Sequence, residues 1–214
     1  MSAEPGLRER KKQRTRQQIA DAAWELFAER GFDGVTVSEV ARAADVSEAT
    51  VFNYFPTKED LVYGRMEAFE EELLEAVRGR ETGESLLDAF ARFVLQPRGL
   101  LAEKGRDAAD RLVTITRVIT GSPALLARER RILDRYTESL AQLIAEETGV
   151  AADDAEPRVV ANALIGVHRT LIDYVRRESL RGGVRPRLAR DVREQGERAL
   201  ARLEHGLGGY AVKR

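Results

Sequence analysis

The 214-residue chain contains no cysteine and only two histidines, and aromatic residues make up 6% of it. Without cysteine the chain can form no disulfide and no thiolate zinc site, and two histidines cannot supply a multi-histidine metal site. No stretch approaches the roughly eighteen apolar residues that a membrane-spanning helix needs. The N-terminus is charged where a signal peptide would be apolar. We therefore expect a soluble, cytoplasmic protein with no metal, no cofactor and no membrane partner.

Sequence templates of common enzymes are also missing. The chain has no GxSxG motif, no phosphate-binding P-loop and no GxGxxG motif after a strand. We therefore expect that it is not an enzyme. Its length leaves room for one large domain, or for a small domain joined to a larger one.

The net charge of −1 conceals an uneven distribution along the chain. Residues 1–20 carry six basic and two acidic side chains, whereas residues 21–60 carry three basic and nine acidic ones. The positive charge is therefore concentrated in a short N-terminal arm that includes Arg14. Because the placement of charge matters more than its total, a nucleic-acid partner remains compatible with this composition. The alternative is that the arm is a solvated, disordered tail before it binds.

Apolar residues recur with helical spacing along nearly the whole chain, and no convincing alternating strand is present. Start and stop signals divide the N-terminal part into short helices. They are Gly31 at the end of a helix over 8–30, the capping-box spacing of Thr36 and Glu39, Ser47 as the cap of a helix that ends at Phe55 before Pro56, and Thr57 at the start of a helix through Val77. Three helices at this spacing, the last two joined by a tight turn, describe a helix-turn-helix unit.

The remaining sequence predicts longer helices over 83–95, 106–120, 123–148, 154–180 and 187–205. Ser122 followed by Pro123 is a favoured helix start, because proline is preferred at the first helical position. We therefore expect an all-α fold with two domains. A helix-turn-helix domain with its basic arm occupies residues 1–56, and a larger helical domain occupies residues 57–214.

Residues 31–61 resemble the DNA-binding region of TetR-family transcriptional regulators. Many fixed spacings coincide, at Gly31-Phe32, Thr36-Val37, Ala41, Ala44, Val46-Ser47, Thr50, Tyr54-Phe55, Lys58-Glu59 and Leu61. The resemblance implies a homodimer whose N-terminal domains read a palindromic operator in double-stranded DNA. It also implies that the C-terminal domains dimerise and enclose a pocket for a small-molecule effector, which releases the protein from DNA.

The family usually has glycine in the turn between the second and third helices, where this chain has Asp45. Aspartate tolerates left-handed backbone geometry better than most residues. We therefore expect the turn to be kept, with some backbone strain at Asp45.

The resemblance places the helix over 47–55 in the major groove, where each base pair presents a distinct pattern of donors and acceptors. The predicted base contacts are Asn53 with adenine, Ala49 and Thr50 with a thymine methyl group and Glu48 with cytosine, next to Ser47 at the helix start. The predicted phosphate contacts are Thr36, Tyr54, Lys58 and Arg14. The alternatives are a solvated carboxylate at Glu48 and a helix cap at Asn53. Val51, Phe52 and Phe55 are expected in the core.

The candidate effector-binding residues are Phe90, Phe93, Thr116, Arg117, Asn162 and Arg169. Thr116 and Arg117 lie in a helix that is apolar on several sides, so their polar groups need partners or a ligand when they are buried. Asn162 and Arg169 form a polar stripe beside His168, and the two phenylalanines could line an opposite wall. An arginine that faces the cavity would indicate an anionic effector, and the C-terminal half also resembles actinobacterial members linked to acyl-CoA-like ligands. For each residue the alternative is a polar or aromatic group that simply packs in the core.

Two apolar stripes on the last two predicted helices are candidates for the dimer interface, since the family builds a four-helix interface from these helices. They are Val160, Leu164, Val167, Leu171 and Val175 on the first and Leu188, Val192, Gly196, Ala199 and Leu203 on the second. Gly196 favours close approach of two helices. The alternative is that both stripes face the chain's own core. Together these features predict a ligand-responsive repressor, and the competing hypothesis is a helical ligand-binding adaptor that does not bind DNA.

Overall fold

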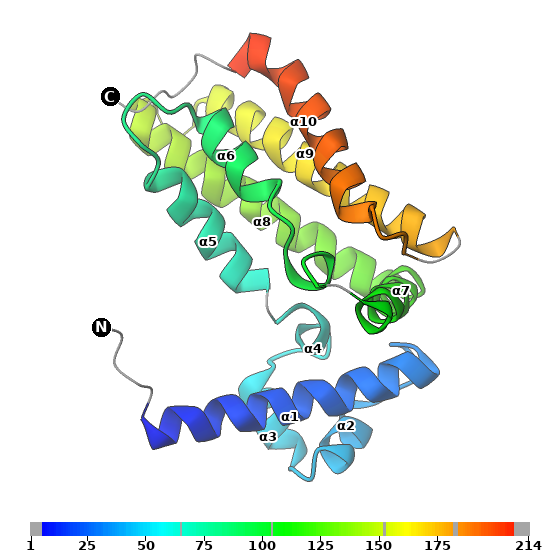
Figure 1. Cartoon of the computed structure of the whole chain (residues 1–214). Helices are drawn as coiled ribbons and strands as arrows, with labels where there is room; N and C mark the ends of the chain where they lie inside the picture. Colours follow the sequence, from blue (N-terminus) through cyan, green and yellow to red (C-terminus); the bar gives the residue numbers. More distant parts are fainter. Residues whose placement is uncertain (1–5, 65, 104, 152, 182–183, 208–214) are drawn as a thin grey trace. The chain divides into compact units, whose positions relative to one another are not determined.

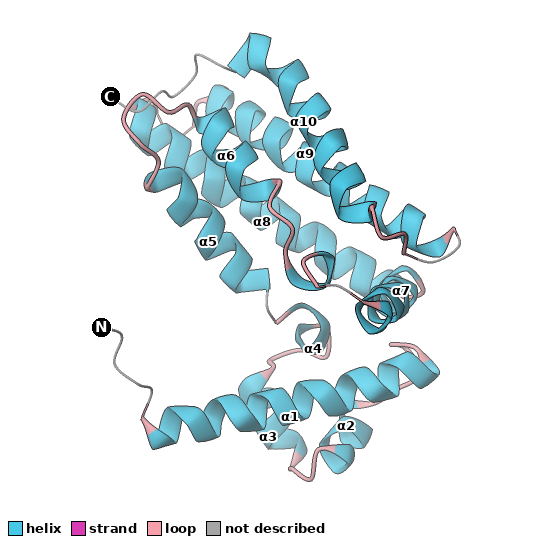
Figure 2. Cartoon of the chain, in the orientation of Figure 1, coloured by secondary structure: helices cyan, strands magenta, loops and turns pink. Residues whose placement is uncertain are grey.

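The computed structural model describes residues 6–64, 66–103, 105–151, 153–181 and 184–207, which are all helices and connecting loops (Figure 2). The expected all-α fold is confirmed, and no strand occurs in these ranges. None of the helices within them is both long and apolar enough to cross a membrane. The contacts divide the chain into two compact units, one of residues 1–64 with 117–128 and one of residues 65–116 with 129–214.

The first unit is built on a long helix and three short ones. They are α1 (Leu7–Arg30), α2 (Val37–Ala43), α3 (Glu48–Tyr54) and α4 (Asp60–Tyr63) (Figure 1). The predicted local signals are confirmed, since Gly31 ends α1 with a φ of 73° and the side chains of Thr36 and Ser47 cap α2 and α3. Asp45 has a φ of 51°, so the turn between α2 and α3 does use left-handed geometry.

Apolar side chains from every helix of this unit meet in one core. α1 packs on α2 and α4, and α2 packs on α3. Phe27 from α1, Val40 from α2 and Val51 from α3 are each at most 1% exposed. The core therefore fixes α3 on the rest of the unit through its inner face and leaves its other face free.

The second unit holds the longer helices. They are α5 (Met66–Arg78), α6 (Leu86–Val94), most of α7 (Arg106–Thr120) and of α8 (Pro123–Thr148), α9 (Ala155–Leu180) and α10 (Leu188–Leu207), with a short 3-10 turn at Gly99–Leu101. The predicted bounds of α7, α8 and α9 are confirmed to within a residue. α6 packs on α5 and α9, and α10 packs on α6 and α9 (Figure 1). Buried ion pairs join α8 to its neighbours, from Glu147 to Arg80 and from Glu129 to Arg176, each with two hydrogen bonds.

The prediction of one helix from Thr57 to Val77 is wrong, because α4 ends at Tyr63 and α5 begins at Met66. Gly64 sits between them, and the guanidinium of Arg16 donates to its carbonyl over 3.1 Å. A Cβ at Gly64 would lie 3.2 Å from the ring of Phe55. The chain thus leaves the helical path where it passes close to α1 and to the end of α3. The first unit accordingly extends to Gly64, beyond the expected domain limit at residue 56; residues 1–5 of that domain lie outside the described ranges.

Candidate nucleic-acid interface

The outer face of α3 is formed by four neighbouring exposed side chains, Glu48, Ala49, Phe52 and Asn53. They are spaced so that they share one side of the helix, opposite the buried Val51. The expectation that Phe52 lies in the core is wrong, because its side chain is 46% exposed. The face therefore combines an amide, a carboxylate and apolar groups, which is the mixture that reads base edges in a major groove.

Two hydroxyl side chains that were predicted to contact DNA cap helices instead of pointing freely to solvent. The hydroxyl of Ser47 accepts from the backbone N–H of Thr50 over 3.1 Å and lies 2.8 Å from the Thr50 hydroxyl. Thr36 and Glu39 form a complete capping box, and Arg30 also donates to Glu39. The backbone N–H of Thr36 and then the Arg30 guanidinium lower the pKa of Glu39 to about 2. These contacts fix the starts of α2 and α3 independently of DNA.

Lys58 lies against the interior of its own unit. Its ammonium donates to the carbonyl of Phe32 over 2.6 Å and lies 4.1 Å from the centre of the Phe32 ring. Burial is the main cause of a lowered pKa for this lysine. The ammonium that was predicted to bind a phosphate thus donates to a backbone carbonyl instead. This hydrogen bond joins the segment before α4 to the loop that follows α1.

The basic side chains of α1 divide into two kinds. Arg14 is exposed and remains suited to a phosphate contact. Arg16 instead donates to the carbonyl of Tyr54 over 3.0 Å and to that of Gly64, and it stacks over Phe55 at 4.6 Å. It therefore ties α1 to the ends of α3 and α4, a role that its place in a basic run did not signal. Tyr54 is half-buried at the last position of α3.

The six candidate effector residues are not brought together. Phe90 and Phe93 are buried in α6, and Thr116 is buried in α7. Arg117 is exposed and belongs to the first unit. Asn162 and Arg169 are exposed on α9, where the Asn162 amide donates to the carbonyl of Arg158. The polar stripe of α9 thus points outward from the chain rather than into a cavity.

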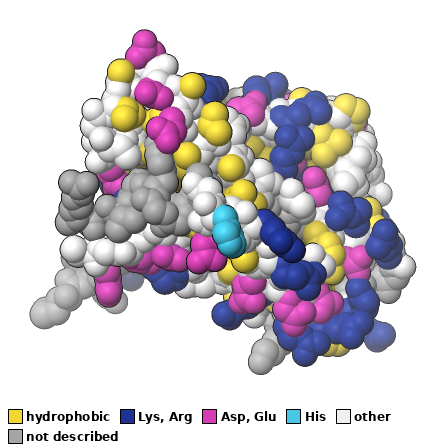
Figure 3. All heavy atoms as spheres, turned by 90° about the horizontal axis from the view of Figure 1, so that it is seen from above, with side chains coloured by type: hydrophobic (Ala, Val, Ile, Leu, Met, Phe, Trp, Pro, Cys, Tyr) yellow, Lys and Arg dark blue, Asp and Glu magenta, His cyan; other side chains and the backbone are white. Residues whose placement is uncertain are grey.

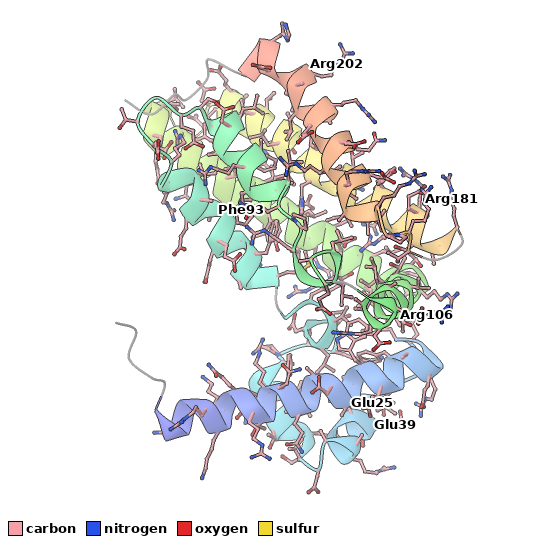
Figure 4. All side chains as sticks on the ribbon, in the orientation of Figure 1. Glu25, Glu39, Phe93, Arg106, Arg181 and Arg202 are labelled. Carbon is pink, nitrogen blue, oxygen red and sulfur yellow. The ribbon has the colours of Figure 1, made fainter. Side chains whose placement is uncertain are left out.

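Phe93 and His168, which the sequence analysis placed around the candidate pocket, belong to an aromatic cluster of the second unit that also includes Phe69 and Tyr136. Phe69 of α5 stacks on His168 of α9 at 4.8 Å and on Tyr136 of α8 at 5.6 Å. It also meets Phe93 of α6, which is labelled in Figure 4, edge-on at 5.3 Å. Burial lowers the pKa of His168 to about 4, so the imidazole is neutral at physiological pH. In the described ranges no group of His, Asp and Glu side chains is arranged to hold a metal ion.

A groove of about 1110 Å³ lies between the 97–110 segment and the start of α10. Most of its lining is apolar, with Leu100, Leu101 and Leu188 among the larger side chains. Its wall carries charges of both signs, positive from Arg106 and Arg185 and negative from Glu103 and Asp110, and Arg185 also pairs with Glu178. It can take a ligand with an apolar body and a polar or charged group.

The predicted dimer stripe of α9 lies mostly in the chain's own core. Val160, Leu164, Leu171 and Val175 are at most 9% exposed, and Val167 is half-buried. On α10 Leu188 and Gly196 are buried, whereas Val192, Ala199 and Leu203 are half-buried. A Cβ at Gly196 would lie 2.3 Å from Leu95 and 3.1 Å from Leu171, so this glycine permits close packing within the chain. Most of these residues therefore fit the alternative interpretation given above, in which both stripes face the chain's own core and not a partner chain.

A different stripe of α9 faces outward. Val159, Gly166, Asp173 and Leu180 recur every seven residues and are all exposed. Val159 is 65% exposed and Leu180 is 46% exposed, and a Cβ at Gly166 would meet no atom within 4 Å. Figure 3 shows acidic, basic and hydrophobic side chains together on one face of the molecule. Along α10, Arg190 pairs with Glu194 and Arg193 pairs with Glu197. The outward side of α9 thus combines two exposed aliphatic side chains and a glycine with charged neighbours, among them Arg169 and Asp173.

Comparison with known proteins gives two matching family models, described as "Bacterial regulatory proteins, tetR family" over residues 19–63 and as "MftR C-terminal domain" over residues 84–207. The HTH-type transcriptional regulator TcmR of Streptomyces glaucescens is 32% identical over 170 residues, which cover 78% of this chain and 75% of that protein. Two solved structures share the fold. One is NalD, the secondary repressor of the MexAB-OprM multidrug efflux pump in Pseudomonas aeruginosa, with a TM-score of 0.56 and 24% identity over 91% of this chain and 98% of that chain. The other is FadR from Bacillus subtilis in complex with stearoyl-CoA, with a TM-score of 0.53 and 22% identity over 86% of this chain and 97% of that chain.

Proposed function

Because the chain belongs to the TetR family of bacterial transcriptional regulators, we propose that it represses transcription as a homodimer on a palindromic operator and is released by a small-molecule effector. The observation that carries this proposal is the outer face of α3, with Glu48, Ala49, Phe52 and Asn53 exposed on a helix that is capped and anchored from behind. In a homodimer the two copies of α3 enter successive major grooves about 34 Å apart.

Each side chain of this face has a matching base edge. The Asn53 amide donates and accepts at adenine, and the Glu48 carboxylate accepts from the amino group of cytosine. Ala49 and Phe52 contact thymine methyl groups, for which their apolar surfaces are suited. Arg14 and the neighbouring cations of α1 contact phosphates and fix the register without reading sequence.

The dimer forms through the outward side of α9, at Val159, Gly166 and Leu180, together with the half-buried Val192 and Leu203 of α10. Gly166 lets a partner helix approach closely, because no side chain stands between the two backbones. Replacement of Gly166 by leucine tests this assignment: sedimentation should then report a monomer, whereas a dimer of unchanged stability places the interface elsewhere.

The effector has an apolar body and an anionic group, and it binds in the groove at Leu100, Leu101 and Arg106. A protein of the same fold holds stearoyl-CoA, which is a ligand of this chemistry. Calorimetry with stearoyl-CoA, stearate and free coenzyme A tests the assignment. The Leu101→Asp variant should lose binding of any ligand that the parent takes up, and retained binding would place the ligand elsewhere in the chain.

Selection from random double-stranded DNA at moderate salt tests the proposed function directly. A recovered palindrome with steep salt dependence supports a dimeric repressor, because phosphate contacts release counterions. Absence of enrichment even at low salt supports the competing hypothesis, a ligand-binding adaptor that does not bind DNA.

A further inference from the structure

The tip of the α7–α8 hairpin, residues 117–128, is part of the first unit. It comprises the last turn of α7, the Gly121–Ser122 connection and the start of α8. Both helices continue without a break into the second unit, to which their remaining residues belong.

Three contacts hold this hairpin tip, one to the loop before α2 and two to α4. The hydroxyl of Ser122 donates to the carboxylate of Asp33 over 2.8 Å, in the loop before α2. The Tyr63 hydroxyl, at the end of α4, donates to the carbonyl of Leu125 over 3.2 Å. Ser122 and Leu125 are at most 1% exposed, so the tip is packed into the unit rather than resting on its surface.

The third contact is an ion pair between Arg128 and Asp60. The guanidinium Nη2 of Arg128 lies 2.8 Å from Oδ1 of Asp60, and the two side chains are 26% and 15% exposed. The second oxygen of the same carboxylate, Oδ2, accepts from the backbone N–H of Thr57 over 2.9 Å. Thr57 is two residues beyond Phe55, the C-cap of α3. One carboxylate thus links the hairpin tip to the segment that directly follows α3.

We propose that Arg128 is a positioning residue for α3, acting through Asp60 and Thr57. The proposal rests on the proposed function, since it takes α3 to be the helix that reads the operator. When Arg128 is present, the mostly buried carboxylate of Asp60 is neutralised and holds the first turn of α4 against the hairpin tip. Without it the carboxylate turns toward water, the bond to Thr57 weakens, and α3 loses the fixed end that keeps it in register for base contacts.

Arg128→Met is the test variant, because methionine keeps much of the side-chain volume and removes the charge. Hydrogen exchange on the free protein should show about tenfold faster exchange for the amides of residues 57–63, with unchanged protection in the middle of α1. Operator affinity should fall about tenfold, a coupling of ordinary size for a residue that touches neither ligand. The slope of affinity against salt should stay unchanged, because no phosphate contact is lost. The matched control is Arg131→Met, which removes an exposed arginine further along α8 and should change none of these quantities.

Two further variants separate positioning from general destabilisation. Arg128→Lys should restore most of the affinity and protection, because its ammonium can still pair with Asp60. Asp60→Asn keeps an acceptor for Thr57 and removes the charge, and adding Arg128→Met to it should cause little further loss.

Several outcomes would overturn the proposal. A salt slope reduced by about one would make Arg128 a phosphate contact, and unchanged exchange at residues 57–63 would remove its link to α3. If Arg128→Met speeds hydrogen exchange throughout the first unit and Arg128→Lys does not restore the protection, Arg128 only stabilises the unit and does not position α3. Because the exchange measurement needs no DNA, it decides the positioning role even where the selection from random DNA shows no operator and the proposed function fails.

Discussion

Replacing Lys58 by methionine distinguishes an internal from a DNA-binding role for this lysine. Methionine keeps the apolar stem and removes the ammonium, which donates to the Phe32 carbonyl over 2.6 Å and lies over the Phe32 ring. A hydrogen bond from a charged donor contributes about 1.5–3 kcal/mol and a partly exposed cation–π contact about 0.5–1 kcal/mol. Since Lys58 is only partly buried, we expect a loss of about 2 kcal/mol in the free energy of unfolding of the first unit.

The assay uses the full chain. Its single tryptophan, Trp24, lies on α1 with its ring 6.2 Å from that of Phe27, so tryptophan fluorescence in urea reports unfolding of the first unit. Lys12→Met, at an exposed position of α1, is the control and should leave the unfolding midpoint unchanged. DNA binding by Lys58→Met should show an unchanged salt slope.

The opposite pattern would refute the reasoning. If the unfolding midpoint of Lys58→Met equals that of the parent while the salt slope falls by about one, the ammonium contributes nothing inside the unit and contacts a phosphate. The hydrogen bond to Phe32 would then describe only the DNA-free protein.

Three further predictions concern stability and base reading. We expect the free energy of unfolding of the parent, minus that of the His168→Phe variant, to fall by up to about 3 kcal/mol as the pH drops from 6.5 to 4. The reason is that the lowered pKa of His168 makes the unfolded state bind more protons than the folded state in that pH range. A difference that stays constant with pH would contradict the burial of the imidazole. Asp45→Gly should stabilise the protein by up to about 1 kcal/mol and Asp45→Val destabilise it by about 1–2 kcal/mol, as measured by urea unfolding, because Asp45 has a φ of 51°. In selections from random DNA, Asn53→Ala should lose an adenine preference and Phe52→Ala a thymine preference, each by about fivefold or more, and an unchanged preference profile would remove that residue from the base contacts.

The helix ends were predictable because their signals are local. The capping box of Thr36 and Glu39, the glycine after α1 and the Ser122–Pro123 start each act within a few residues. No distant part of the chain is needed to satisfy the free N–H and C=O groups at these ends. The geometry of Asp45 was predictable on a different ground, because the resembled family usually has glycine at this position and aspartate tolerates left-handed geometry.

The break at Gly64 was not predictable in the same way. Apolar residues keep helical spacing on both sides of it, so periodicity alone joins α4 and α5. At Gly64 the chain passes beside the ring of Phe55 and accepts a hydrogen bond from Arg16, which lies forty-eight residues away in the chain. The internal roles of Arg16 and Lys58 escaped notice for a related reason. The sequence around an arginine or lysine does not show whether its side chain will bind a DNA phosphate or a backbone carbonyl of its own chain.

The faces of α9 show why the sequence alone did not predict which side of this helix a partner chain covers. The apolar stripe with Leu164 was assigned to a partner chain and the polar stripe with Asn162 to a pocket, yet the first is buried within the chain and the second is exposed. Hydrophobic periodicity reports that a helix face is covered, but a core and a partner cover it equally well. The informative residue is Gly166, which is exposed with open space around it and sits between the exposed Val159 and Leu180 on one seam. A helix gains nothing in its own chain from a glycine there, since glycine costs helix stability relative to alanine, by about 1 kcal/mol. Close approach of a second helix offsets that cost, which is why the dimer proposal follows this outward face and not the more apolar one.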